Sequence, residues 1–177
     1  MRRPRTPSAV LAALAIASAA GLVLSGGSSA APTKSQELFE KTLLADAKTT
    51  PAIKSLLSTR GGFVAPDLTF GDLTGDGRSD AIVSVDTGGV AGAVAVYVFS
   101  TDGEAADSPL RAVYRSQRLY RASTEVVGNT LVLRTPHYAP GDDICCPAKI
   151  VQHTYAWNAH DKTLRQRSAV DVAAPTG

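Results

Sequence analysis

Residues 70–100 read FGDLTGDGRSDAIVSVDTGGVAGAVAVYVFS and contain two apolar stretches rich in β-branched residues, 81–86 and 93–100. The glycine pair Gly88-Gly89 lies between them, and a turn signal between two such stretches predicts a strand, a turn and a second strand. Parallel neighbours need a long crossover, which this short connection cannot supply, so the two strands are predicted to pair antiparallel. The segment therefore indicates a β-rich fold.

The same pattern of extended stretches and turn signals is found just before these two stretches and continues after them toward the C-terminal end. It predicts six more strands, at 68–71, 111–117, 119–127, 131–135, 149–157 and 164–172. Upstream, 33–47 has apolar residues at near-helical spacing with Ser35 as the expected N-cap, and Pro51 suits the first turn of a second helix. We predict an α+β fold in which N-terminal helices within 33–60 pack on a mostly antiparallel meander of about seven to eight strands within 63–172.

Residues 1–30 have the composition of a secretory signal peptide. Three arginines precede the apolar run 10–24, and Ser28-Ser29-Ala30 offers the small residues of a signal-peptidase site. The alternative is a retained N-terminal anchor, for which the apolar run is short. We predict cleavage after Ala30, a single secreted domain at 31–177, an extracellular location and no stable membrane span after cleavage.

The charge of the predicted mature chain limits the class of partner. Removal of 1–30 takes away three arginines and no acidic residue, which leaves 15 basic against 16 acidic side chains. No dense basic patch remains, so nucleic-acid binding loses its main compositional support. We expect a monomer that meets an extracellular or cell-envelope partner.

The loop 72–80 has the spacing of a calcium-binding turn. Oxygen-bearing groups stand at relative positions 1, 3, 5, 7 and 9, and Gly77 at position 6 permits the sharp bend. The predicted ligands are Asp72, Thr74, Asp76, Arg78 (backbone carbonyl) and Asp80. Val83 stands where an EF-hand needs its bidentate glutamate, which excludes an EF-hand. Two interpretations stay open, a structural Ca²⁺ site or carboxylates that only cap the turn by accepting backbone N–H bonds.

This loop resembles the FG-GAP/VCBS calcium loops of extracellular β proteins. The shared features are the strand–loop–strand context, the pattern D-x-T-x-D-G-x-x-D and Phe70-Gly71 just ahead of it. Thr74 departs from the more usual Asp or Asn, and a single copy cannot build the multi-bladed propeller that such repeats form. The resemblance implies a calcium ion that holds the hairpin in place, without a catalytic role.

Cys145 and Cys146 are adjacent, and they are the only cysteines of the chain. Thiols of exported proteins tend to oxidise, and an intrachain bond between these two is a vicinal disulfide. Its loop is minimal, so it constrains the unfolded chain little and is expected to stiffen a turn. The alternatives are free or intermolecular thiols, and a soft-metal site with His137 or His153.

Several segments together resemble small secreted proteins and lipoproteins of actinobacteria. They are the export signal, the short helix, DLTGDGRSDAIV at 72–83, TPHYAPGDDICCP at 135–147 and a strand ending in TYAW at 154–157. The LppP/LprE lipoprotein family is the named group that they resemble. Gly27 stands where such a lipoprotein carries its lipidated cysteine, and the resemblance implies no catalytic residue.

The predicted function is that of an exported, non-catalytic binding module. Tyr138, Tyr155 and Trp157, with the cysteine pair, are the candidate recognition surface, because aromatic side chains give contact area at low entropy cost. Core packing is the other interpretation of Tyr155 and Trp157, which alternate on one strand face. The alternative function is a small extracellular enzyme, a hydrolase or thiol redox protein that uses the Cys145-Cys146 and histidine region.

Overall fold

The computed structural model describes residues 31–101 and 109–174, and the predicted signal peptide at 1–30 lies outside them. Within the described residues the chain forms two helices followed by nine strands. The elements are α1 (Lys34–Ala45), α2 (Pro51–Thr59), β1 (Phe63–Val64), β2 (Thr69–Gly71), β3 (Asp80–Asp86), β4 (Ala93–Ser100), β5 (Arg111–Gln117), β6 (Ser123–Val127), β7 (Thr130–His137), β8 (Lys149–Asn158) and β9 (Thr163–Ala173). No helix in this part of the chain combines the length and the hydropathy that crossing a membrane requires.

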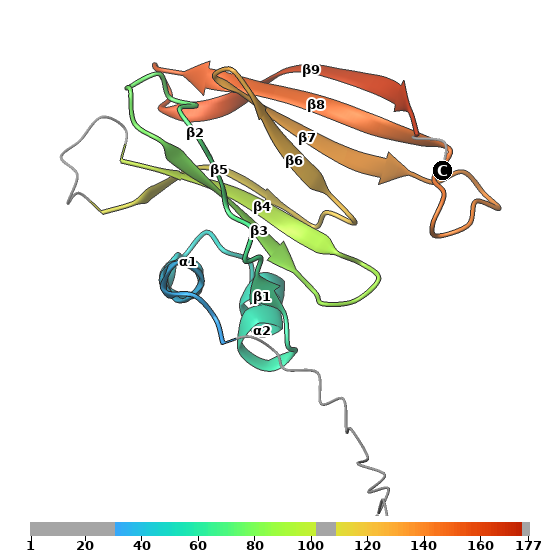
Figure 1. The fold of residues 1–177 in the computed structure, drawn as a ribbon, viewed down its shortest axis with the longest axis horizontal. Helices are drawn as coiled ribbons and strands as arrows, with labels where there is room; N and C mark the ends of the chain where they lie inside the picture. Colours follow the sequence, from blue (N-terminus) through green and yellow to red (C-terminus); the bar gives the residue numbers. More distant parts are fainter. Residues whose placement is uncertain (1–30, 102–108, 175–177) are drawn as a thin grey trace, which may run out of the picture. The chain divides into compact units, whose positions relative to one another are not determined.

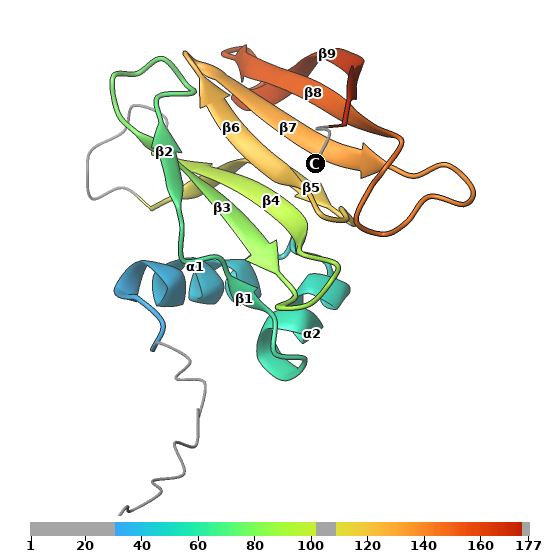
Figure 2. The same cartoon turned by 45° about the vertical axis from the view of Figure 1, so that its right-hand side comes forward.

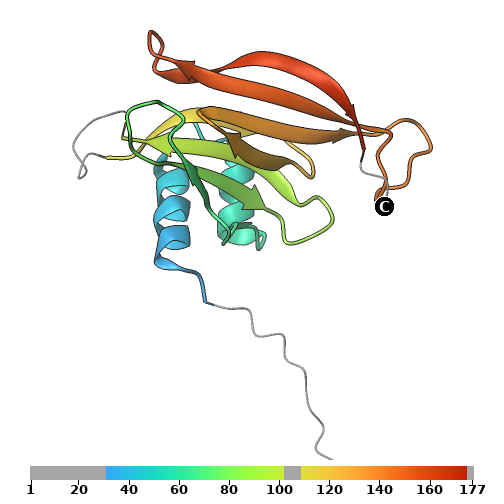
Figure 3. The same cartoon turned by 45° about the horizontal axis from the view of Figure 1, so that its top comes forward.

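The strands form two antiparallel sheets. The first sheet has the order β1-β3-β4-β5, and β2 pairs with the same edge of β3 as β1. The second sheet is the meander β6-β7-β8-β9. The second sheet covers one face of the first, and both helices cover the other face (Figures 1 and 3). The predicted α+β class is confirmed, with the strands divided between two sheets where one sheet was expected.

Helix α1 begins with a capping box at Thr33, so the predicted N-cap at Ser35 was wrong. The Thr33 hydroxyl accepts a hydrogen bond from the Gln36 backbone N–H (3.2 Å), and Gln36 Oε1 accepts one from the Thr33 N–H (2.8 Å). This reciprocal pair satisfies backbone donors at the helix start that have no intrahelical partner. Gln36 also donates through Nε2 to the carbonyl of Val64 (2.7 Å), which ties the start of α1 to β1.

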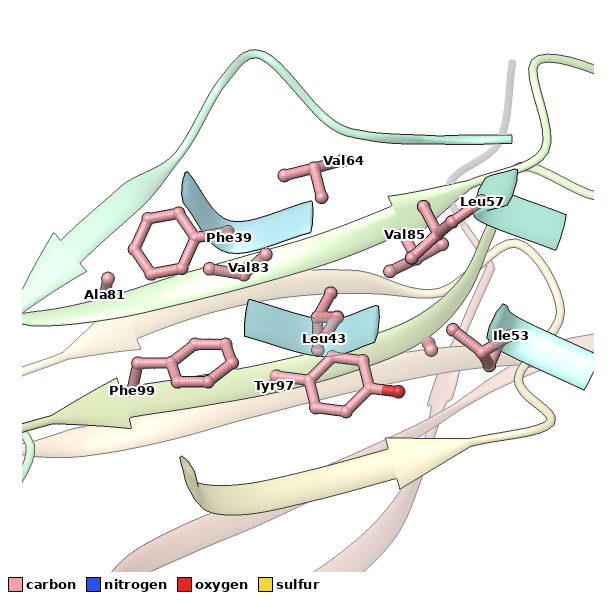
Figure 4. Close-up of a cluster of buried hydrophobic side chains, with 11 residues drawn as sticks. Phe39, Leu43, Ile53, Leu57, Val64, Ala81, Val83, Val85, Tyr97 and Phe99 are labelled. Carbon is pink, nitrogen blue, oxygen red and sulfur yellow. The ribbon is translucent and has the colours of Figure 1, made fainter. Parts of the chain in front are cut away.

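Side-chain alternation along β3 and β4 divides the interior into two hydrophobic clusters. The odd-numbered residues of both strands face the helices and form the first cluster, which Figure 4 shows. Leu43 of α1 is fully buried in it, and the rings of Phe39 and Phe99 lie 5.3 Å apart. This cluster fixes the helices on the first sheet.

The even-numbered residues of the same strands face the second sheet. Ile82 and Val98 pack there with Leu131 and Leu133 of β7 in the second cluster. Strand β3 is therefore buried on both faces, which explains its nearly continuous apolar sequence. Burial of both faces also means that a shift of one residue in β3 would exchange the two sets of side chains.

The connection between the two sheets is a turn that the sequence pattern missed. The strand predicted at 119–127 begins later, at Ser123, because the preceding residues run beside the start of β4. Arg118 and Arg121 have left-handed φ values of 70° and 48°, and the Arg121 N–H donates to the Ala91 carbonyl (2.9 Å). Left-handed φ is uncommon outside glycine and asparagine. The turn carries no glycine, proline or asparagine, so it gave no turn signal.

Truncation of Leu43 tests the helix–sheet cluster. We expect Leu43→Ala to lower the free energy of unfolding by about 2–5 kcal/mol, because it leaves a cavity in a fully buried site. Urea denaturation followed by circular dichroism measures the loss. Leu38→Ala on the same helix is the matched control, because this leucine is 52% exposed, and its change should stay within about 0.5 kcal/mol. Equal losses in the two variants would contradict this packing.

Candidate functional site

Asp72 organises the backbone of the acidic loop between β2 and β3. Its Oδ1 accepts hydrogen bonds from the N–H groups of Gly75 (2.7 Å) and Asp76 (3.1 Å), and its Oδ2 accepts one from Gly77 (3.0 Å). Gly75 and Gly77 have φ values of 77° and 80°, which side-chain-bearing residues rarely adopt. The predicted turn-capping role of Asp72 is therefore seen directly. A carboxylate has about four acceptor sites, of which Asp72 uses three here.

Asp80 closes the loop from inside the protein. It begins β3, is 1% exposed, and accepts hydrogen bonds through Oδ2 from the N–H groups of Leu73 (2.8 Å) and Thr74 (2.9 Å). Burial raises the pKa of Asp80 above 3.8, and the nearby charge of Asp76 adds to that rise; hydrogen bonds from Ser100, Leu73 and Thr74 oppose it without cancelling it. The hydrogen bonds thus stabilise the charged form of Asp80, whereas burial disfavours it, and the effect of burial is the larger.

Two oxygens of the loop are buried without a partner. Thr74 Oγ1 and Asp76 Oδ2 are inaccessible to solvent and accept or donate no hydrogen bond within the described residues. Asp76 Oδ1, in contrast, accepts a hydrogen bond from the Arg78 backbone N–H (2.8 Å). No three His, Cys, Asp or Glu side chains of residues 31–101 and 109–174 form a metal-binding group. Unpaired buried oxygens are the chemistry that a hard cation would satisfy.

The acidic loop also joins the two sheets. Leu73 is fully buried in the cluster between the sheets, and Asn129, in the β6–β7 turn, donates through Nδ2 to the Asp72 carbonyl (2.8 Å). A Cβ atom on Gly71 would lie 2.7 Å from the Val126 side chain, so only glycine permits this approach of β2 to β6. The loop lies at the opposite end of the sheets from the β3–β4 and β7–β8 connections (Figure 2).

Cys145 and Cys146 form the predicted vicinal disulfide in the β7–β8 loop. Asp142 folds this loop by accepting hydrogen bonds through Oδ2 from the N–H groups of Ala139 and Ala148, both at 2.7 Å. The hydroxyl of Tyr138 donates to the carbonyl of Ile144 (2.9 Å). The soft-metal alternative for the cysteines does not fit, because both sulfurs are bonded to each other.

Arg121 connects the β5–β6 turn to the β7–β8 loop. Its Nη1 donates to the Ile144 carbonyl and lies 3.3 Å from the Tyr138 hydroxyl. The ring of Tyr138 also meets that of Tyr120 edge-on, with centroids 5.9 Å apart. These contacts position Tyr138 from two sides, which limits its rotation in the free protein.

The disulfide and Tyr138 line a cavity of about 630 Å³ on the outer face of the second sheet, which we call the disulfide cavity. Apolar groups of β7, the β7–β8 loop, β8 and the residue after β9 form most of the remaining wall: Pro136, Pro147, Ile150 and Ala174. Arg121 and Arg134 add positive charge, and Arg134 also pairs with Glu125 (2.7 Å). Such a site favours a ligand with an apolar body and a polar or anionic group.

Tyr155 and Trp157 do not join this surface. Both pack against the cluster between the sheets, and the ring of Tyr155 lies edge-on to that of Tyr114 at 4.7 Å. Burial raises the pKa of Tyr114, as expected for a phenol in this core. The core interpretation of Tyr155 and Trp157 fits the structure, and the three predicted recognition aromatics are not brought together. The alternating apolar pattern of β8 was the signal for the core.

The pH dependence of stability tests the buried state of Asp80. The pKa of this acid is raised in the folded protein, so the protonated side chain favours the folded state. This stabilisation is complete below pH 3.8 and is lost as the pH rises through the pKa of Asp80 in the folded protein. We expect the unfolding free energy of the wild type, relative to Asp80→Asn, to fall over that interval. Urea denaturation in a pH series with a calcium chelator measures it, and a constant difference between the two proteins would contradict the assignment.

Intact mass tests the disulfide. Alkylation of the denatured, unreduced protein is expected to add nothing, and alkylation after reduction is expected to add two groups at Cys145 and Cys146. Two alkyl groups without a reductant would show free thiols and contradict the disulfide.

One curated protein is similar to this chain over part of its length. Lipoprotein CseA of Streptomyces avermitilis is 27% identical over 111 residues, which cover 63% of this chain and 49% of the relative. The chain therefore spans about half the length of that relative. No family model matches the chain, and no solved structure matches it significantly. The chain is thus similar to an actinobacterial lipoprotein.

Proposed function

We propose that this chain is an exported, non-catalytic binding module of the cell envelope, and that the disulfide cavity is its recognition site. The observation that carries the proposal is the wall of that cavity, in which the vicinal disulfide and Tyr138 are held by Arg121 and by the folded loop. A wall that is rigid before binding loses little conformational entropy when a ligand enters.

The cell-envelope setting rests on two independent observations. The relative from Streptomyces avermitilis is named a lipoprotein, and residues 1–30 of this chain have the composition of an export signal. We also propose that the chain is like the LppP/LprE lipoproteins, which the resemblance of its Cys-Cys-Pro loop and its acidic loop supports. We propose that the module acts as a monomer on a partner of the same compartment.

Binding is favoured over catalysis by the neighbourhood of the cysteines. Cys145 and Cys146 are bonded to each other, and none of the described histidines lines the disulfide cavity. Among the described residues, the side chains of His137, His153 and His160 make no hydrogen bond to a serine, cysteine or carboxylate, and His137 interacts with Asp171 only through its charge. A hydrolase needs such a pair of nucleophile and base, and a thiol redox protein needs an attacking thiolate.

The acidic loop is proposed to hold a structural calcium ion, as in FG-GAP/VCBS loops. Thr74 Oγ1 and Asp76 Oδ2 support this because they are buried oxygens without partners, at positions 3 and 5 of the motif. Asp72, Asp80 and the Arg78 carbonyl would complete an oxygen-only ligand set. The ion would neutralise the repulsion between Asp76 and Asp80 and so hold β2, β3 and the β6–β7 turn together.

Thermal unfolding tests the calcium proposal. We expect the melting temperature to rise with calcium relative to chelator, with half-saturation at about 10⁻⁴–10⁻³ M as in extracellular modules. Asp76→Ala should abolish the rise, and Asp143→Asn, an exposed carboxylate in the β7–β8 loop, should keep it. Identical melting with and without millimolar calcium, in the wild type as in Asp76→Ala, would overturn the proposal.

The fluorescent probe 1-anilinonaphthalene-8-sulfonate, an apolar anion, tests the disulfide cavity. We expect saturable binding of one probe per folded chain, because the cavity combines apolar walls with two arginines. Ile150→Glu places a negative charge in the cavity and should weaken binding at least about tenfold, a change of roughly 1.4 kcal/mol. Val170→Glu is the control, since Val170 is exposed on β9 away from the cavity lining. Equal affinities of the two variants would contradict the assignment.

A further inference from the structure

A second cavity, of about 490 Å³, lies where the hydrophobic core between the sheets ends, and we call it the polar cavity. Even-numbered residues of β3 face the second sheet, and toward the β3–β4 turn they change from Ile82 to Ser84 and Asp86. Ser123 and Thr124 of β6 line the same space. The buried face of the strand therefore continues as a polar wall.

The polar groups of this cavity have few partners in the protein. Its four hydroxyl side chains belong to Thr69, Ser84, Ser123 and Thr124. None of them makes a hydrogen bond to another residue within 31–101 and 109–174, and neither does the carboxylate of Asp67. Asp86 uses only Oδ1, which accepts a hydrogen bond from the Gly88 N–H (2.7 Å). These donors and acceptors are free for water or for a ligand.

Arg121 forms the wall between the polar cavity and the disulfide cavity, and it lines both. Its left-handed backbone is held by the hydrogen bond to Ala91, and its Cα lies 3.6 Å from the place a Cβ of Gly92 would occupy. Within the described residues, only Nη1 of its guanidinium donates hydrogen bonds, so the N–H groups of Nε and Nη2 can donate to a ligand. Strained residues that neighbouring structure holds in place cluster at ligand-binding sites.

We propose that the polar cavity binds a saccharide unit that is neutral or carries an amino group. Paired hydroxyls of a sugar match carboxylate oxygens as acceptors and serine and threonine hydroxyls as donors or acceptors. An apolar ligand would leave these groups unpaired, and an anionic ligand would face two carboxylates against one guanidinium. The volume of about 490 Å³ is in the range of small-molecule sites. The two cavities share Arg121 and Ser123, but Ser84, Asp86 and Thr124, which carry this proposal, line the polar cavity and not the disulfide cavity.

Titration of the isotope-labelled protein with three sugars, followed by NMR, tests the inference. Maltose is the neutral probe, the disaccharide of glucosamine is the cationic probe, and glucuronic acid is the anionic probe. We expect saturable shifts of amides at 84–92 and 121–124 with the first two sugars, and none with glucuronic acid. No shift with either of the first two sugars at about 20 mM, which corresponds to very weak binding, would overturn the proposal. Stronger binding of glucuronic acid than of these two sugars would overturn it as well.

Matched variants identify the side chains that act. Asp86→Asn keeps an oxygen that can accept from the Gly88 N–H but removes the negative charge. It should weaken the binding of the glucosamine disaccharide at least about tenfold. Thr124→Val removes a hydroxyl without changing the shape of the side chain, and it should weaken the binding of both maltose and the glucosamine disaccharide. Thr154→Val makes the same change on β8, outside the cavity lining, and should leave binding unchanged. Wild-type affinity in both cavity variants would overturn the proposal.

Discussion

Burial of β3 on both of its faces is the constraint on which the rest of this structure depends. Odd-numbered residues of β3 pack against the helices and even-numbered residues pack against the second sheet. Because the period of a strand is two, only one register satisfies both clusters. The acidic loop sets that register, since Asp80 pairs with Gly71 and holds the Leu73 and Thr74 backbone at the head of the strand.

The two ends of β3 have different roles in this account. At its start, the carboxylates of Asp72 and Asp80 and the side-chain amide of Asn129 join β2, β3 and the β6–β7 turn, where we propose a structural ion. At its end, Arg121 of the β5–β6 connection contacts the other two connections, β3–β4 through Ala91 and β7–β8 through Ile144. The proposed ion site and the cavity lining around Arg121 therefore lie toward opposite ends of β3, so substitutions can test each of them separately.

The elements with a strong periodic signal were predictable from the sequence. Strand β4 is an almost continuous apolar run, β3 and β7 contain the apolar stretches 81–83 and 131–133, and Leu38, Phe39 and Leu43 have the spacing of a helix. The disulfide was predictable because the chain offers each cysteine one partner. Asp72 and Asp80 were placed by their spacing to Gly77, although spacing alone does not separate a turn cap from an ion ligand.

Features that depend on long-range contacts were not predictable in the same way. The division into two sheets rests on left-handed Arg118 and Arg121, residues with no intrinsic preference for such a turn. The polar cavity was missed because Ser84 and Asp86 on β3 look like ordinary strand-end residues until β6 is placed opposite them. The aromatic pair of β8 was ambiguous between surface and core, since alternation shows that one face is buried without showing which cluster it meets.

The central claim is that recognition is confined to the Arg121 end of the sheets and that the acidic loop takes no part in it. The most direct measurement is a map of amide chemical-shift changes on addition of 1-anilinonaphthalene-8-sulfonate, recorded with the calcium level held constant. The account predicts changes at 118–124 and 138–150, and none at 72–80. Changes centred on the acidic loop, or spread over the exposed length of β9, would contradict it.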